Sequence, residues 1–106
     1  TVVLVSSIDK KKAGFVYHDH WTTDGDYIYS GEGKTGDQTM SLGNKAIVDA
    51  ENDEKKIHLF VKFSPQEYYY QGVFSLVDYT YEDDKDESGN MRKEYKFRLR
   101  KQSVEE

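Results

Sequence analysis

Regular alternation of apolar and polar residues in two stretches limits the fold of this chain more than any other feature. The stretches are KKIHLFVKF (55–63) and MRKEYKFRLRK (91–101). Side chains of a β-strand point alternately to its two faces, so each stretch predicts a strand with one buried face. The predicted inward side chains are Ile57, Leu59, Val61, Phe63, Tyr95, Phe97 and Leu99. The outward row of the second strand is Lys96, Arg98 and Arg100.

Four further stretches are typical of strands. TVVLVSSI (1–8), GFVYHDHW (14–21) and DYIYS (26–30) are rich in β-branched and aromatic residues, and Asp24-Gly25 predicts a tight turn between the last two. EYYYQGVFSLVDYTY (67–81) predicts a long strand that bends at Gly72, where glycine permits a bulge. The polar run DDKDESGN (83–90) predicts the turn that follows this strand.

A short helix is expected after the glycine-rich segment, where apolar residues recur at spacings of four, one and three. They are Leu42, Ala46, Ile47 and Ala50. Candidate caps for its first turn are Asp37, Thr39 and Ser41. Six strands with one or two short helices predict a mainly β (α+β) fold. We expect a curved, barrel-like sheet in a single domain spanning residues 1–106.

Length and composition narrow the class of protein. A chain of 106 residues has one core, and without cysteine it has no disulfide and no thiolate metal site. No apolar run approaches the ~18 residues that cross a bilayer, and no signal-peptide pattern opens the chain. We therefore expect an intracellular domain with no membrane partner. Because the sequence begins at Thr1 and not at methionine, we also expect it to be excised from a longer protein.

Charge is distributed unevenly along the chain. The formal net charge of −5 argues against nonspecific nucleic-acid binding, which depends on neutralising phosphates. Two acidic runs, DAENDE (49–54) and EDDKDE (82–87), are interpreted as solvated loops. Two other segments are basic: DKKK (9–12) and RKEYKFRLRK (92–101). A basic face on an acidic protein therefore remains open.

Known catalytic motifs are missing from the sequence. There is no cysteine nucleophile and no GxSxG motif, and GKT (33–35) lacks the spacing of a phosphate loop. The best metal candidate is HDHW (18–21), where His18 and His20 share one strand face and a loop carboxylate, Asp24 or Asp26, lies close by. Two histidines at a strand end are more often only hydrogen-bonded. We predict no enzymatic activity, no bound metal and no cofactor.

Aromatic residues are concentrated in two places. Tyr17, Trp21, Tyr27 and Tyr29 bracket one predicted hairpin, and Tyr68–Tyr70 lie beside Gly72. Most of them are explained by a core and a sheet surface. The alternative is a flat pocket that stacks a planar ring between aromatic faces, with polar groups at the edge of that ring.

Five motifs in order resemble the SRA (SET- and RING-associated, or YDG) domain family. They are YSGEG (29–33), GDQ (36–38), GNKAI (43–47), YYQGVFSLV (69–77) and YKFRLR (95–100). The chain is most similar in style to SRA-like modules joined to HNH nucleases in modification-dependent restriction enzymes. The resemblance implies a β-barrel-like fold and a noncatalytic reader of double-stranded DNA. Such a reader flips 5-methylcytosine, or another 5-modified cytosine, into an aromatic pocket, while cleavage belongs to a fused nuclease domain.

The resemblance also assigns roles to residues. It implies that Tyr17 and Tyr29 sandwich the flipped base and that Ser30 lines the pocket beside the methyl group. The full set of expected pocket residues is Tyr17, Asp19, His20, Tyr29, Ser30 and Gly31. Expected contacts to the DNA backbone are Lys10, Lys11, Lys12, Lys34, Lys45, Arg98 and Arg100. The remaining motif residues are structural: Asp37, Gln38, Gly43, Asn44, Tyr70 and Gly72.

Three departures from the family pattern bear on these roles. His20 stands where the family has the carboxylate that accepts a hydrogen bond from the cytosine amino group. Asp19 is its neighbour, but neighbours on a strand face opposite sides, so only one of the two serves unless the strand bulges. The segment between Gly33 and Asp37 is too short for the finger that probes the second strand in methylation-maintenance members. Gln71 replaces the acidic residue of the YDG motif.

Two rival functions remain at this point. One is a β-barrel module that binds RNA or protein without flipping a base, which the acidic charge and the replaced carboxylate favour. The other is a metal-dependent enzyme that uses His18, His20 and Asp24 or Asp26. The glycines of SGEGKTG (30–36) favour the function of a DNA reader, because they allow the backbone to approach a flipped nucleotide. They also suit a tight loop at a barrel corner.

Overall fold

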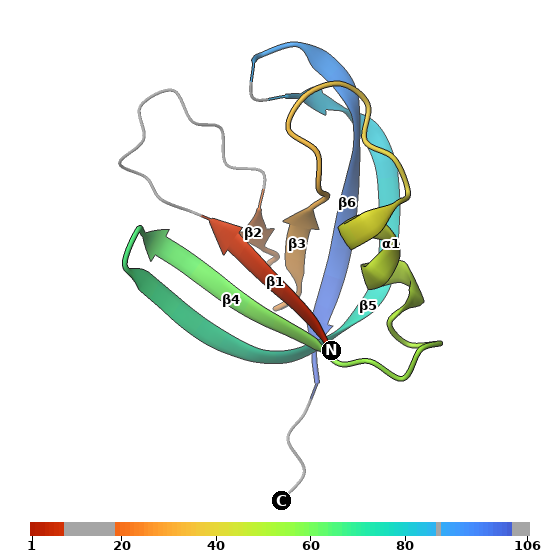
Figure 1. The fold of residues 1–106 in the computed structure, drawn as a ribbon. Coiled ribbons are helices and arrows are strands. Elements are labelled where there is room, and N and C mark those ends of the chain that lie inside the picture. Colours follow the sequence, from red (N-terminus) through yellow and green to blue (C-terminus); the bar gives the residue numbers. More distant parts are fainter. Residues whose placement is uncertain (8–18, 87, 103–106) are drawn as a thin grey trace, which may run out of the picture.

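A computed structural model describes residues 1–7, 19–86 and 88–102 of the chain. In this part of the chain one sheet of six strands accompanies one helix (Figure 1). The elements are β1 (Val2–Ser7), β2 (His20–Trp21), β3 (Tyr27–Ser30), α1 (Leu42–Asp49), β4 (Ile57–Ser64), β5 (Glu67–Lys85) and β6 (Met91–Lys101). Among the described residues, no helix is long and apolar enough to cross a membrane.

The sheet has the strand order β1-β4-β5-β6-β3-β2 and curls into a half-barrel (Figure 1). All neighbouring strands are antiparallel except β1 and β4, which run parallel. The two limbs of the curl are β1–β4 and β3–β2, and polar contacts from Ser6 reach across to β3. The predicted mainly β, barrel-like fold with a short helix is confirmed.

The core fills the inner face of the curl. The predicted alternation of buried and exposed side chains is present along β4 and β6. Leu59, Phe97 and Leu99 have 0% of their surface exposed. Helix α1 adds Ile47 to this core, and β5 adds Phe74. Phe63 lies on the same face as Val61, in contact with the ring of Tyr69, but not in the core. It is at the end of β4, next to the hairpin, where 44% of its surface is exposed.

Strand β5 bends where the sequence predicts it. Leu59 of β4 pairs with Gly72, whereas the next residue, Phe60, pairs with Tyr70, so Gln71 is the extra residue of a β-bulge. Gly72 has φ +111°, a conformation that other residues rarely adopt. The predicted bulge is confirmed.

The turn after β5 is shorter than DDKDESGN predicts, and the solvated-loop interpretation of EDDKDE is wrong for its first residues. Strand β5 continues to Lys85 because Asp83 and Asp84 pair with Lys93 and Arg92 of β6. Lys93 also forms an ion pair with Asp83 at 3.1 Å. Opposite charges on facing strands stabilise the ladder, so the run is strand and not loop.

The prediction that Leu42 lies on the buried face of the helix is wrong. Leu42 has φ +48° and is 83% exposed, because the chain enters the helix through a left-handed residue. The buried face instead holds Asn44 and Ile47, with Ala50 just after the helix. Ser41 is the N-cap residue, but no side chain among Asp37, Thr39 and Ser41 caps the helix.

Of the predicted strand 14–21, the structure describes the end, and β2 consists of His20–Trp21. The predicted turn after it is present. Thr22 N–H donates to the Asp26 carbonyl at 2.7 Å, and Gly25, with φ +91°, donates to the Thr22 carbonyl at 3.1 Å. Trp21 therefore lies edge-on to the ring of Tyr27, with centroids 4.7 Å apart.

Candidate nucleic-acid interface

A chain of polar contacts orients Asp19 where β1 meets β2 and β3. The backbone N–H of Ser30 donates to Asp19 Oδ1 at 2.7 Å. The Ser6 hydroxyl donates to Asp19 Oδ2 at 2.5 Å and lies 2.5 Å from the Tyr27 hydroxyl. Ser6 and Tyr27 are each 1% exposed, so this support is buried. The carboxylate is thus fixed from two sides, and its remaining lone pairs stay available to accept hydrogen bonds.

Both tyrosines of β3 remain protonated. Burial raises the pKa of Tyr27 to about 12, and the hydrogen bond to Ser6 opposes part of this rise. Burial, with the carboxylates of Asp19 and Glu32 adding to it, raises the pKa of Tyr29 to about 12. A neutral Tyr27 hydroxyl donates to Ser6 Oγ, which leaves the Ser6 proton for Asp19. Tyr29 packs its ring against the core and keeps a neutral hydroxyl.

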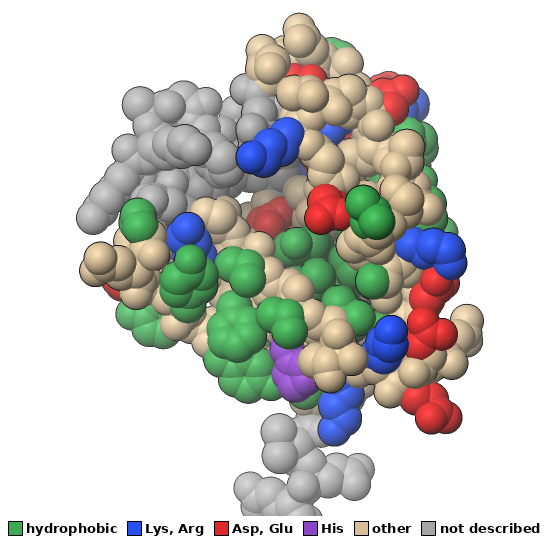
Figure 2. All heavy atoms as spheres, viewed as in Figure 1, with side chains coloured by type: hydrophobic (Ala, Val, Ile, Leu, Met, Phe, Trp, Pro, Cys, Tyr) green, Lys and Arg blue, Asp and Glu red, His purple; other side chains and the backbone are tan. Residues whose placement is uncertain are grey.

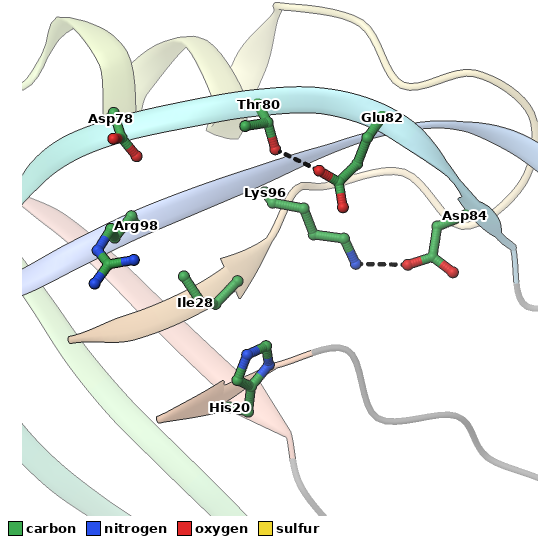
Figure 3. Close-up of a pocket in the computed structure, with 8 residues that line it drawn as sticks. All are labelled: His20, Ile28, Asp78, Thr80, Glu82, Asp84, Lys96 and Arg98. Atoms are coloured by element: carbon green, nitrogen blue, oxygen red, sulfur yellow. Dashed lines mark hydrogen bonds and ion pairs between the residues drawn. The ribbon is translucent and has the colours of Figure 1, made fainter. Parts of the chain in front are cut away.

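His20 lies on the other face of the sheet from this polar chain. Trp21 pairs with Tyr27 and His20 pairs with Ile28, so the strand alternation sends His20 outward. There it lines a groove of about 490 Å³ with Ile28 of β3 and side chains of β5 and β6 (Figure 3). The structure therefore brings Asp19, and not His20, to Ser30.

The glycine segment after β3 is held by two buried amides. Gln38, 3% exposed, donates from Nε2 to the carbonyls of Gly31 at 2.6 Å and Gly33 at 3.2 Å. Its Oε1 accepts the backbone N–H of Tyr95 at 2.8 Å. Asn44, 2% exposed, accepts the backbone N–H of Glu32 through Oδ1 at 2.6 Å. Asn44 Nδ2 donates to the carbonyls of Glu32 at 3.1 Å and Thr39 at 3.0 Å.

Further contacts tie this segment to β6 and to α1. Asp37 Oδ1 accepts the backbone N–H of Lys93 at 2.7 Å. The Glu32 carboxylate accepts the N–H of Gly43 at 3.1 Å and so stabilises the first turn of α1. Gly31 is required here, because a Cβ at this position would lie 2.5 Å from Gln38 Oε1.

Three supporting residues were not predicted from the sequence. Ser6 reaches Asp19 from β1, Glu32 reaches α1 from the loop, and Arg92 lies beneath the loop with 7% exposure. Arg92 Nη1 donates to the carbonyls of Gly33 at 3.0 Å and Gly36 at 2.9 Å. Of the three, only Arg92 belongs to a segment that the sequence analysis singled out. That segment is basic, which indicated an exposed side chain and not a buried one.

The arginines expected to contact phosphates are paired with carboxylates. Arg98 Nε donates to Asp26 Oδ2 at 2.7 Å, and Arg100 Nη2 donates to the same oxygen at 2.9 Å. Arg98 also holds Asp24 at 2.7 Å. The hydrogen bonds from Arg100 and Arg98 lower the pKa of Asp26 to about 2. Positive charge on this part of β6 is therefore largely compensated.

The other expected site residues are spread over the molecule. Lys34 is exposed on the loop, and Lys45 forms an exposed ion pair with Asp49 at 2.5 Å. Tyr70 lies far along β5 from Asp19, on the limb next to β4, where its hydroxyl contacts His58 Nδ1 at 2.8 Å. Tyr17 and Lys10, Lys11 and Lys12 lie outside the described residues.

The described residues offer no group of three side chains that could hold a metal ion. Of the metal candidates, His18 lies outside these residues, and Asp26 is occupied by two arginines. The aromatic residues divide between the two interpretations. Tyr27 is core, Tyr29 is half-buried beside Asp19, and Tyr68–Tyr70 are exposed.

Solved structures similar to this chain share its fold. An SRA domain of SUVH5 in complex with hemi-methylated CG DNA is 23% identical with a TM-score of 0.68; the match covers 99% of this chain and 67% of that one. The sulfur-binding and SRA domains of ScoMcrA with phosphorothioated DNA are 20% identical with a TM-score of 0.74, over 92% of this chain and 29% of that one.

The phosphorothioation-dependent restriction endonuclease ScoMcrA itself is 16% identical with a TM-score of 0.75, over 93% of this chain. This chain corresponds to 18% of the length of that protein. A comparison with curated proteins gives no significant match. The sequence matches the profile of the family described as "ScoMcrA-like, SRA domain" from residue 1 to residue 106. The chain therefore belongs to the ScoMcrA-like SRA domain family.

Proposed function

We propose that this chain is a noncatalytic reader of modified double-stranded DNA that takes a flipped 5-modified cytosine, such as 5-methylcytosine, beside Tyr29 and Asp19. The observation that carries the proposal is the oriented Asp19 carboxylate, held by the Ser30 N–H and the Ser6 hydroxyl. Similar proteins crystallised with methylated or phosphorothioated DNA support it. In this proposal cleavage belongs to a fused nuclease domain.

In this proposal Asp19 takes the role of the family's pocket carboxylate, whose position in the sequence is occupied by His20. An ionised carboxylate only accepts hydrogen bonds, so it matches the amino group of cytosine and opposes the O4 acceptor of thymine. Tyr29 forms one aromatic wall, and the resemblance gives Tyr17 as the other. Stacking contributes about 1–3 kcal/mol per base and offsets the few kcal/mol that extrusion from the duplex costs.

The alternative function is a module that binds RNA or protein without flipping a base, and one of the two observations that favoured it still does. Its case rested on the net charge of −5 and on the replaced carboxylate. The pairing of Arg98 and Arg100 with Asp26 strengthens the charge argument. The Asp19 carboxylate beside Ser30 argues against the second, because it offers an acid close to the position of the replaced one.

The experiment compares Asp19→Asn with His20→Asn. Binding of each variant to duplexes with one cytosine or one 5-methylcytosine is measured by fluorescence anisotropy at two salt concentrations. Asp19→Asn is expected to weaken binding of the modified duplex by about tenfold, the effect of about 1–3 kcal/mol from one lost base-edge contact. His20→Asn, on the opposite face, is the matched control and should bind like the wild type. A loss of preference in His20→Asn alone would overturn the assignment of Asp19.

A further inference from the structure

Aromatic side chains are exposed on the outer surface of the β1–β4 limb and of the part of β5 that pairs with β4. The inner surface of the same strands forms the core. Leu59 and Val61 point inward and are buried, whereas Tyr68 and Tyr70 are 52% and 53% exposed. Val3 and Val5 of β1 pair with His58 and Phe60 of β4, on the side of β4 away from β5, and are 57% and 46% exposed. Figure 2 shows hydrophobic side chains gathered over this limb beside a histidine. Such a patch on a folded domain marks a binding surface.

Strand register brings the rings together. Phe60 pairs with Tyr70, and their ring centroids are 5.1 Å apart. His58 stacks on Tyr70 at 5.8 Å with an interplanar angle of 30°, and its Nδ1 lies 2.8 Å from the Tyr70 hydroxyl. Ring packing and this hydrogen bond hold Tyr70 in place. Tyr68 pairs with Lys62, two residues further along each strand, so the rings form a row.

The charge of this surface is opposite to that of the whole chain. Lys62 Nζ lies 5.5 Å from the centroid of the Tyr68 ring. The outward positions of β1 and β4 are Val3, Val5, Ser7, His58, Phe60 and Lys62, which include no carboxylate. The groove at the other end of the same outer face contains Asp78, Glu82 and Asp84 together with Lys96 and Arg98 (Figure 3). Both cations are ion-paired there, Lys96 with Asp84 and Arg98 with Asp26. The aromatic limb therefore suits an anion that carries flat rings, and the groove does not.

We propose that His58, Phe60, Tyr68 and Tyr70, with Lys62, form a second binding surface, for single-stranded nucleic acid. Exposed aromatic faces on a sheet stack unpaired bases, and a lysine beside them contacts the phosphates. Bases in a duplex are stacked on each other and are not available to these rings. This surface lies on the outer face of the sheet, opposite the core that Tyr29 packs against, and it does not depend on base flipping.

The neighbour of these tyrosines supplies a matched control. Tyr69 lies between Tyr68 and Tyr70 in sequence and is 50% exposed, but it pairs with the inward residue Val61 and points to the other face. Its ring contacts Phe63, with centroids 5.3 Å apart. Replacing Tyr69 by alanine removes a similar exposed ring without touching the proposed surface.

The test measures anisotropy of labelled dT12 and rU12 and of a hairpin duplex, with far-UV circular dichroism as the check of folding. Tyr68→Ala and Tyr70→Ala are each expected to weaken single-strand binding about tenfold, while Tyr69→Ala and Tyr29→Leu keep it. Lys62→Gln is expected to lower the salt dependence of log K by about 0.7. Absent wild-type binding to both oligonucleotides would overturn the proposal, as would equal losses in Tyr69→Ala and Tyr70→Ala. Sedimentation showing a dimer that Tyr70→Ala dissociates, with single-strand binding unchanged, would identify a protein interface instead.

Discussion

Replacing Gln38 by alanine should destabilise the domain more than any comparable change at its surface. Gln38 is buried and forms three side-chain hydrogen bonds, to the carbonyls of Gly31 and Gly33 and from the N–H of Tyr95. The alanine variant loses all three partners at once. The Gly33 carbonyl keeps its bond from Arg92, so two partly buried backbone groups lose their side-chain partner, Gly31 C=O and Tyr95 N–H.

The expected magnitude follows from those two groups. Each buried group left unsatisfied costs about 1–3 kcal/mol. Because both contacts are only partly buried, we expect the lower part of the summed range, a loss of about 2–4 kcal/mol of unfolding free energy. A domain of this size has a total stability of about 5–15 kcal/mol, so the loss is a large fraction of it. The loop that follows Tyr29 would then lose its fixed position before the global fold is lost, and binding of modified DNA should weaken with it.

Urea denaturation followed by far-UV circular dichroism measures the change. Lys45→Ala is the control, because Lys45 is exposed and its ion pair with Asp49 lies on the surface, where such pairs contribute little to stability. A free energy of unfolding for Gln38→Ala within about 0.5 kcal/mol of the wild type, which is the range of neutral surface changes, would refute the reasoning.

Three further outcomes follow from single positions. Gly31→Ala places a Cβ 2.5 Å from Gln38 Oε1 and should cost about 1–3 kcal/mol in the same urea assay; a neutral result would mean that the loop relaxes freely. Leu42 is exposed and has a left-handed backbone conformation, which asparagine adopts at lower cost. Leu42→Asn should therefore raise the thermal midpoint by a few degrees, the effect of about 1 kcal/mol, and a lower midpoint would contradict the presence of strain at this residue. The pKa of Asp26 is lowered from 3.8 to about 2, so its contribution is complete above pH 4 and is lost as the pH falls toward 2. Asp26→Asn should therefore flatten the stability profile between pH 4 and pH 2, and an unchanged profile would contradict this.

The fold follows from local patterns because those patterns depend on near neighbours in the chain. Alternation in 55–63 and 91–101 places the core residues, and glycine at position 72 marks the bulge. Leu42 was wrongly assigned to the helix face because periodicity does not reveal where a left-handed entry shifts the helical register. The long β5 was underestimated because its last residues are stabilised by charges on β6, not by their own propensity.

The site depends on contacts that no local pattern contains. Alternation indicated that Asp19 and His20 face opposite sides, but the choice between them requires the pairing of β2 with β3. Ser6 supports Asp19 from a strand at the other end of the sheet order, so its role follows only from the curl of the sheet. Arg92 belongs to a basic run, yet two loop carbonyls and Glu94 surround its guanidinium.

Binding of the wild-type chain to matched DNA duplexes tests the proposed reader most directly. The duplexes carry cytosine, 5-methylcytosine or 5-hydroxymethylcytosine at one position, and anisotropy is recorded at two salt concentrations. The proposal predicts tighter binding of one modified duplex, with a preference that persists at the higher salt because base-edge contacts and stacking, not phosphates, create it. Equal, weak and salt-sensitive binding to all three duplexes would contradict it.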